Sequence, residues 1–308
     1  MLWILLVLAY GLLKGFREIA KKKAMIKNTV MEVLVAYTAL SFVFVLPQAP
    51  KATGLESRFY FYIALKSLAV FLAWICSFHS LKKLPVSVFG ILDLSRVLFA
   101  TAFGLFLLGE TLNLTQFAGL ATVCAGLLLL KFRLPFFDKI FHKNKIDKKD
   151  SDDSTDSKNS EIAHPQTESI GTIYVILALA SCLLNAISGY MDKVLMRDIT
   201  SSQLQFWYTL FMMGYYALYV LFTRTKIGLS VWKNKWIWLL AIMFIIGDKA
   251  LFIANGIPES RITVMTLIKQ SGCLVTILGG HFIFKEKDTA YRLFCATIII
   301  LGILIGLL

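Results

Sequence analysis

Residues 84–130 read LPVSVFGILDLSRVLFATAFGLFLLGETLNLTQFAGLATVCAGLLLL, and residues 260–306 repeat that pattern as SRITVMTLIKQSGCLVTILGGHFIFKEKDTAYRLFCATIIILGILIG. Each stretch contains two apolar runs joined by a short turn with a glutamate in it. At an offset of 176 residues the matched pairs are Val88/Val264, Ser95/Ser271, Leu98/Leu274, Gly104/Gly280, Phe106/Phe282, Glu110/Glu286 and Gly126/Gly302. Because leucines match by chance in any apolar sequence, the glycines and the glutamate are the evidence for an internal duplication.

The composition indicates a membrane protein. Of the 308 residues, 57% are hydrophobic and 17% are charged, and the mean hydropathy is +0.71, which is more apolar side chain than a soluble core of this size buries. The opening at Met1 lacks the basic region and cleavage site of a secretory signal, so we expect the first apolar run to be a span. The net charge of +13 comes from basic residues scattered over the connections and the polar gap, which favours membrane topology over nucleic-acid binding.

A membrane span needs about 20 apolar residues, and this length predicts ten transmembrane helices. They lie at Leu2–Ile19, Val30–Leu46, Phe59–Phe78, Val86–Leu108, Leu114–Leu130, Gly171–Tyr190, Gln203–Phe222, Trp236–Asn255, Ile262–Phe284 and Ala290–Leu308. We therefore expect an all-α integral membrane protein with a first five-helix repeat (residues 1–130) and a second (170–308). The charged linker between them (131–169) has the composition of a disordered tether.

The number of spans in each repeat decides the expected arrangement. A second copy that follows five spans enters the membrane from the opposite side, so the two halves are expected to be inverted repeats. Such repeats place a binding cavity near the membrane midplane, and rocking of one half against the other exposes that cavity to alternate sides.

The ordered set of ten spans resembles the EamA-type branch of the drug/metabolite transporter superfamily. The resemblance is carried by Leu108-Gly109-Glu110-Thr111 with Gln116-Phe117-Ala118-Gly119, by Phe284-Lys285-Glu286-Lys287 with Gly302, and by Lys21-Lys22-Lys23-Ala24, Tyr190-Met191-Asp192-Lys193 and Gln205-Phe206-Trp207. It implies secondary transport of a small metabolite or drug-like compound, often outward, across the cell (plasma or inner) membrane, but it does not imply a substrate. Our own prediction for the cargo is an amino acid or a similar polar solute. Many relatives have proline in the fourth and ninth spans, and this chain has none there.

Charged residues inside the predicted spans mark the candidate site, because a charge at the bilayer centre costs about 2.5–3.5 kcal/mol on insertion scales. Asp93 and Lys269 occupy equivalent mid-span positions in the two copies. They are predicted to lie on opposite walls of one cavity, where they could bind the two ends of a zwitterion or where Asp93 could exchange a proton. The alternative is a structural ion pair, including a pair between Asp93 and Arg96 on one helix face.

Five further residues complete the predicted substrate-binding set. Lys14 is a candidate, with pairing to Glu18 one turn away as the alternative, and Asn185 lies near the matching position in the second copy. Asp248 is expected to face the cavity while its neighbour Lys249 points elsewhere, because adjacent helical residues diverge by about 100°. Trp74 and Tyr190 are candidate aromatic walls, as is Tyr10, although packing between helices would also explain each of them.

Other polar residues are predicted to be structural. Glu110 and Glu286 each precede a helix and are expected to cap it. The five cysteines lie in apolar runs, and neither they nor the four histidines show the spacing of a metal site. We therefore expect no cofactor and no metal; the partners are a small-molecule substrate, the lipid bilayer and a proton or coupling ion. An integral membrane enzyme acting on lipid-linked substrates and a channel are the alternatives to a transporter.

The distribution of Lys and Arg predicts the orientation. The odd-numbered connections together with the linker contain 21 of these residues, and the even-numbered connections contain 5. Since the cytoplasmic side of a membrane protein carries the excess of Lys and Arg, the odd connections and the linker are predicted to be cytoplasmic and both termini external.

Overall fold

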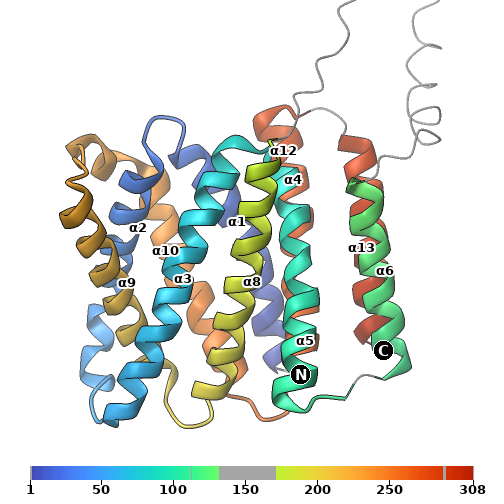
Figure 1. The fold of residues 1–308 in the computed structure, drawn as a ribbon, viewed down its shortest axis with the longest axis horizontal. Helices are drawn as coiled ribbons and strands as arrows, with labels where there is room; N and C mark the ends of the chain where they lie inside the picture. Colours follow the sequence, from blue (N-terminus) through green and yellow to red (C-terminus); the bar gives the residue numbers. More distant parts are fainter. Residues whose placement is uncertain (1, 112, 132–170, 287–288, 308) are drawn as a thin grey trace, which may run out of the picture.

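The computed structural model describes residues 2–111, 113–131, 171–286 and 289–307, and these residues form a bundle of helices without a β-strand (Figure 1). The helices of the first half are α1 (Leu2–Ala24), α2 (Val30–Val45), α3 (Ser57–Lys83), α4 (Val86–Leu92), α5 (Arg96–Leu108) and α6 (Leu114–Lys131). Those of the second half are α8 (Thr172–Leu195), α9 (Ser201–Thr223), α10 (Lys235–Asn255), α11 (Ile262–Lys269), α12 (Gly272–Phe284) and α13 (Thr289–Leu307). Short 3₁₀ turns are η1 (Leu46–Lys51), η2 (Asp93–Ser95) and η3 (Leu229–Lys233).

Each predicted span has helical structure at its position, and seven of these segments are long and apolar enough to cross a membrane. The seven are Val30–Lys51, Ser57–Lys83, Val86–Leu108, Thr172–Leu195, Ser201–Thr223, Lys235–Asn255 and Ile262–Phe284. These seven are counted among the described residues. α1 is rich in charged residues, and the apolar parts of α6 and α13 are shorter. The chain is therefore a multi-pass helical membrane protein, whereas the full set of ten spans stays a prediction. The predicted linker lies outside the described residues except for Lys131.

The starts of two equivalent helices follow from local sequence. Thr29 precedes α2, and its side chain accepts a hydrogen bond from the backbone of Glu32 while the Glu32 carboxylate accepts one from the backbone of Thr29. Thr200 and Gln203 make the same reciprocal pair at the start of α9. Such a capping box satisfies donors that the first helical turn leaves free, so each second helix begins at a position that the sequence specifies.

The fourth and ninth predicted spans are interrupted at equivalent points, although neither contains proline. η2 separates α4 from α5, and the turn at Gln270 and Ser271 separates α11 from α12. In this turn, the backbone amide of Gln270 donates to Leu267 (3.0 Å) and that of Ser271 to Ile268 (3.1 Å), so the spacing tightens from four residues to three. Both segments still match the predicted spans Val86–Leu108 and Ile262–Phe284, and each interruption lies next to a charged side chain, Asp93 or Lys269.

At the break between α11 and α12 the backbone of α1 approaches closely. A Cβ atom at Gly15 would lie 2.5 Å from the carbonyl oxygen of Gly272, and one at Gly272 would lie 2.4 Å from that of Gly11. These distances are too short for any side chain, so the three glycines allow the backbones of the two halves to touch.

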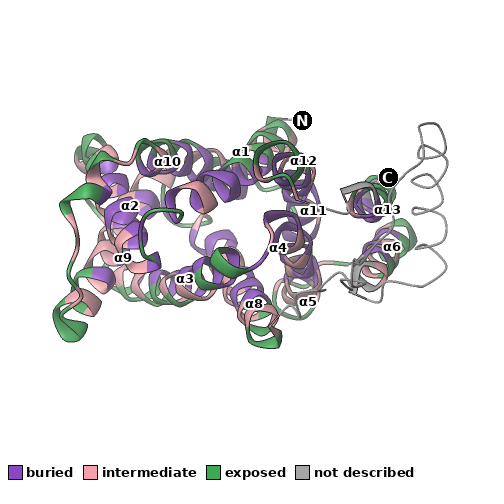
Figure 2. Cartoon of the chain, turned by 90° about the horizontal axis from the view of Figure 1, so that it is seen from above, coloured by how far each residue is buried: buried purple, intermediate pink, exposed green. Residues whose placement is uncertain are grey.

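Helices of one half pack against helices of the other in matched combinations (Figures 1 and 2). α1 packs against α10 and α3 against α8, and α4 and α5 pack against α12 and α11. α2 packs against α9, and α6 packs against α13 at one edge of the bundle. Exchanging the two halves turns α1–α10 into α3–α8 and α4–α12 into α5–α11, and it maps α2–α9 and α6–α13 onto themselves.

The connections between helices lie at the two opposite ends of the bundle. At one end the Asn234 side chain donates to the carbonyl of Ala24 (3.2 Å), and Lys82 donates to the carbonyl of Asn28 (3.4 Å). At the other end Gln203 donates to the carbonyl of Thr53 (2.9 Å). The lysine-rich connections after α1 and α3 thus share one end with the connection after α9, and the connections after α2 and α8 meet at the opposite end.

Candidate functional site

A cavity of about 80 Å³ lies between the two halves and is lined by side chains from both. Its charged lining residues, among those that the structure describes, are Lys14, Arg17, Glu18, Lys21, Lys66, Asp93, Arg96, Asp192, Asp248 and Lys269. Each of these residues is buried or nearly so. A buried cluster of ten charges within apolar helices is costly unless the charges are paired or serve a ligand.

Asp93 lies at the centre of one group of charges. It accepts a hydrogen bond from Lys14 of α1, and its other oxygen lies 2.7 Å from Nη2 of Arg96. The alternative of an Asp93–Arg96 pair is therefore present in the structure. Pairing of Lys14 with Glu18 was wrong, because the break after α4 brings Asp93 against α1, and Glu18 pairs instead with Lys21 at 2.7 Å.

Two ion pairs join the halves across the cavity. Nη1 of Arg17 on α1 lies 3.2 Å from Oδ1 of Asp248 on α10, and Nη2 of Arg17 donates to the Tyr10 hydroxyl at 3.2 Å. Nζ of Lys66 on α3 lies 3.1 Å from Oδ1 of Asp192 on α8. These two pairs occupy the matched contacts α1–α10 and α3–α8, and in both the first half contributes the cation and the second half the acid.

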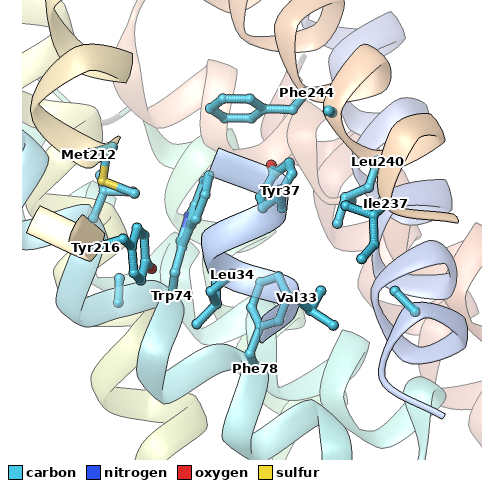
Figure 3. Close-up of a cluster of buried hydrophobic side chains, with 14 of the residues drawn as sticks. Val33, Leu34, Tyr37, Trp74, Phe78, Met212, Tyr216, Ile237, Leu240 and Phe244 are labelled. Carbon is cyan, nitrogen blue, oxygen red and sulfur yellow. The ribbon is translucent and has the colours of Figure 1, made fainter. Parts of the chain in front are cut away.

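Aromatic rings complete the charged lining. The ammonium group of Lys66 lies 3.5 Å from the ring centroid of Tyr208, which is close enough for a cation–π interaction. Tyr37 and Trp74 stack with ring centroids 4.8 Å apart, and Phe244 meets both rings edge-on (Figure 3). This aromatic cluster gives one wall of the cavity a rigid apolar surface beside the ion pairs.

Lys269 differs from the other cavity cations. It is 7% exposed, and its ammonium group has no carboxylate oxygen within 4 Å in the described part of the chain. Asp192 and Asp248 attract it at longer range, whereas Arg96 and Lys14 repel it. Asp93 and Lys269 therefore line the same cavity without forming a pair with each other.

The structure brings most of the predicted site residues together. Asp93, Lys269, Lys14, Asn185, Asp248 and Trp74 all line the cavity. Tyr190 is not among the lining residues; it is half-buried against Phe103 of α5, with ring centroids 6.3 Å apart. The side chain of Lys249 donates to Gln48 (2.9 Å) and Ser202 (2.8 Å), away from the cavity that Asp248 lines.

The sequence did not assign the pairing of Lys66 with Asp192, nor a role for Arg17. Lys66 and Arg17 lie inside predicted spans, and Asp192 follows the predicted end of another at Tyr190. The signal that could have found this pair is the packing of the third span of one repeat against the first span of the other, which the structure shows between α3 and α8.

Glu110 and Glu286 are caps, but of different helices from those predicted. Glu110 accepts from the backbone amides of Ile262 (2.8 Å) and Thr263 (3.3 Å), which begin α11. Glu286 accepts from the amides of Val86 (2.6 Å) and Ser87 (3.3 Å), which begin α4. Each glutamate thus caps the interrupted span of the opposite half. The prediction that each caps the helix following it was wrong, because inverted packing brings the turn of one hairpin onto the start of the other.

Two glycines make room for these caps. A Cβ atom at Gly104 would lie 2.8 Å from Oε2 of Glu110, and one at Gly280 would lie 2.7 Å from Oε2 of Glu286. This contact explains why the duplication preserves both the glycine and the glutamate six residues later.

Helices long and apolar enough to cross a membrane, packed around a cavity lined by charged side chains, form the architecture of a multi-pass membrane protein. The model of the EamA-like transporter family matches residues 1–132. The chain is 34% identical over 83 residues to an "Uncharacterized transporter in cobO 3'region" from Sinorhizobium sp.; the match covers 27% of this chain and 59% of that relative. The chain thus matches less than two thirds of the relative's length. A solved structure described as "Crystal structure of protein" shares the fold, with a TM-score of 0.67, 13% identity and coverage of 99% of this chain and 98% of that chain.

Proposed function

We propose that this protein is a secondary transporter that carries a small organic metabolite or drug-like compound across the cell membrane. The observation that carries the proposal is the internal cavity, which is lined by charged side chains from both halves of an apolar helical bundle. Ionisable residues inside membrane spans mark solute and ion pathways, because burying them without such a role is unfavourable. The family match favours transport over a lipid-modifying enzyme or a channel.

Alternating access between two inverted five-helix repeats is the proposed mechanism. Its support is the reciprocity of the contacts between halves, above all the exchange of caps between Glu110 and Glu286. The interrupted helices at Asp93 and Lys269 support it as well, because discontinuous helices form the binding sites of many transporters with inverted repeats. Rocking of the halves would then expose the same lining residues to either side in turn.

Six predicted residues retain a proposed role in binding the solute: Asp93, Lys269, Lys14, Asn185, Asp248 and Trp74. Tyr190 has a proposed role in packing, on the basis of its contact with Phe103. The cargo predicted from the sequence is an amino acid or a similar polar solute, with export as the direction that the family resemblance favours; the charges of the cavity narrow this class in the next subsection. Coupling to a proton or another ion is part of the same proposal.

Reconstitution into liposomes tests this function. Vesicles loaded with an unlabelled solute are diluted into its labelled form, using a panel of amino acids, organic acids, nucleosides and cationic drugs. We expect saturable counterflow of at least one solute and its loss on Arg17→Met, which leaves Asp248 unpaired in the cavity. A matched Lys249→Met variant, altered outside the cavity, should retain counterflow. Vesicles that exchange no solute faster than protein-free ones would refute transport.

A further inference from the structure

The charges that line the cavity do not balance. Among the described lining residues, six are cations (Lys14, Arg17, Lys21, Lys66, Arg96 and Lys269) and four are anions (Glu18, Asp93, Asp192 and Asp248). The cavity therefore has a formal excess of two positive charges when these groups hold their ordinary protonation states.

The ion pairs show where this excess lies. Three pairs are neutral: Arg17 with Asp248, Lys21 with Glu18, and Lys66 with Asp192. The remaining groups are unbalanced, because Lys14 and Arg96 share the single carboxylate of Asp93 and Lys269 has no carboxylate within 4 Å in the described residues. The excess is thus concentrated at the two helix breaks, around Arg96 in the first half and Lys269 in the second.

Hydrogen-bond donors are also left over at this position. The buried Nε atom of Arg96 has no partner in the described structure, although Nη2 of the same side chain is paired with Asp93. The ammonium group of Lys269 lies 5.8 Å from the ring centroid of Tyr10, so an aromatic face is its near neighbour. Glu18 Oε2 and Asp192 Oδ1 also lack a hydrogen-bond partner in the described structure, but all four carboxylates lie within 4 Å of a cation, so the unbalanced charge of the cavity is positive.

We propose that the solute is a small organic anion whose carboxylate or phosphate group binds between Lys269 and Arg96. A negatively charged ligand supplies the missing counter-charge, and charge-assisted hydrogen bonds from lysine and arginine to such groups are among the strongest in proteins. A cation would lack a free carboxylate, and a zwitterion would find a partner for only one end. This inference rests on the proposed transport function for its physiological role, but binding is measured separately.

Matched ligands test the proposal on the full-length protein in phosphatidylcholine nanodiscs, which supply no anionic headgroup. One set has a four-carbon body: succinate, its neutral diamide, γ-aminobutyrate and putrescine. The other compares glycerol 3-phosphate with glycerol. The measurements are ligand-induced thermal stabilisation and Kd by calorimetry. We expect succinate or glycerol 3-phosphate to bind, and the neutral, zwitterionic or cationic counterparts not to bind. Comparison of the two sets shows whether the site prefers a carboxylate or a phosphate.

Substitutions at Lys269 and Lys249 test whether the anion binds at the proposed position. Lys269→Met should weaken anion binding at least about tenfold, because it removes a buried charged partner. Lys269→Arg should retain most of the affinity, and Lys249→Met should bind like the unmodified protein because Lys249 contacts Gln48 and Ser202 instead. Preferential binding of putrescine or γ-aminobutyrate, absence of binding by every anion, or unchanged anion binding by Lys269→Met would each overturn the inference.

Transport measurements separate the two proposals. Counterflow of a cationic or zwitterionic solute, without competition by any anion, would leave the transporter proposal intact and overturn the anionic substrate class. Anion binding that depends on Lys269, in vesicles that exchange no solute, would support the anion site and refute transport.

Discussion

Two buried lysines of the same cavity are expected to respond in opposite ways to the same substitution. Lys66 is 1% exposed and is paired with Asp192, whereas Lys269 is 7% exposed and has no carboxylate within 4 Å among the described residues. Methionine preserves much of the volume of lysine but removes the charge. Lys66→Met therefore leaves an acid unpaired, while Lys269→Met removes a charge that lacks a partner.

The expected magnitudes follow from these environments. Breaking a buried ion pair by removing one partner costs about 3–5 kcal/mol, and Lys66→Met also removes the cation above the ring of Tyr208. A charge at the centre of a span costs about 2.5–3.5 kcal/mol on insertion scales. Because Asp192 and Asp248 offset part of that cost at longer range, we expect Lys269→Met to stabilise the ligand-free protein by about 1–2 kcal/mol.

Thermal unfolding in detergent, followed by tryptophan fluorescence without added ligand, measures both effects. The Tm of Lys66→Met should fall below that of the unmodified protein, and the Tm of Lys269→Met should rise above it. The double variant Lys66→Met/Asp192→Asn should recover much of the lost stability, because no carboxylate is then left unpaired. If both single variants lower the Tm equally, the distinction between a paired and an unpaired lysine is wrong.

Three further predictions concern the caps, the linker and the orientation. Glu286→Ala should cost about 2–4 kcal/mol and Glu110→Ala about 1–2 kcal/mol, because Glu286 also pairs with Arg292 at 2.9 Å; equal losses of Tm would contradict this. Deletion of residues 147–163, outside the described structure, should leave a monodisperse protein that retains transport, because so polar a segment buries little apolar surface; collapse of expression would argue against a simple tether. A cysteine introduced at Ser157, in a background without the native cysteines, should resist a membrane-impermeant maleimide in intact cells, since the lysine-rich side is expected to be cytoplasmic; labelling without lysis would reverse the orientation.

The positions of the helices could be predicted from hydropathy because a span requires a long apolar run. The helix breaks could not, because the chain has no proline there and the interruption depends on contact with another helix. Gly272 shows the reason, since its backbone touches Gly11 and Gly15 of α1. A contact between residues more than 250 positions apart leaves no local pattern beyond the glycines themselves.

The residues of the candidate site could be predicted better than the ion pairs that they form. The cost of burying charge identified Asp93, Lys14, Asp248 and Lys269 as residues of interest, and the structure places all four on one cavity. Which acid each cation would meet depended on distances across the bundle. Local spacing favoured Lys14 with Glu18, whereas the folded chain offers Lys14 a carboxylate at the break after α4.

The two copies are most similar in sequence at the contacts between the halves and least similar at the cavity. The glutamates that exchange caps and the glycines that accommodate them are preserved at the same offset, because inverted packing presents both halves with the same interface. At the helix breaks the copies differ: Asp93 corresponds to Lys269, and Arg96 corresponds to Gly272. Gly272 is required by the close approach of α1, so the second half has no room for an arginine there and carries its positive charge at position 269 instead. The resulting cavity has unlike walls, which suits a solute whose two ends differ, with its anionic end directed toward the unpaired cations.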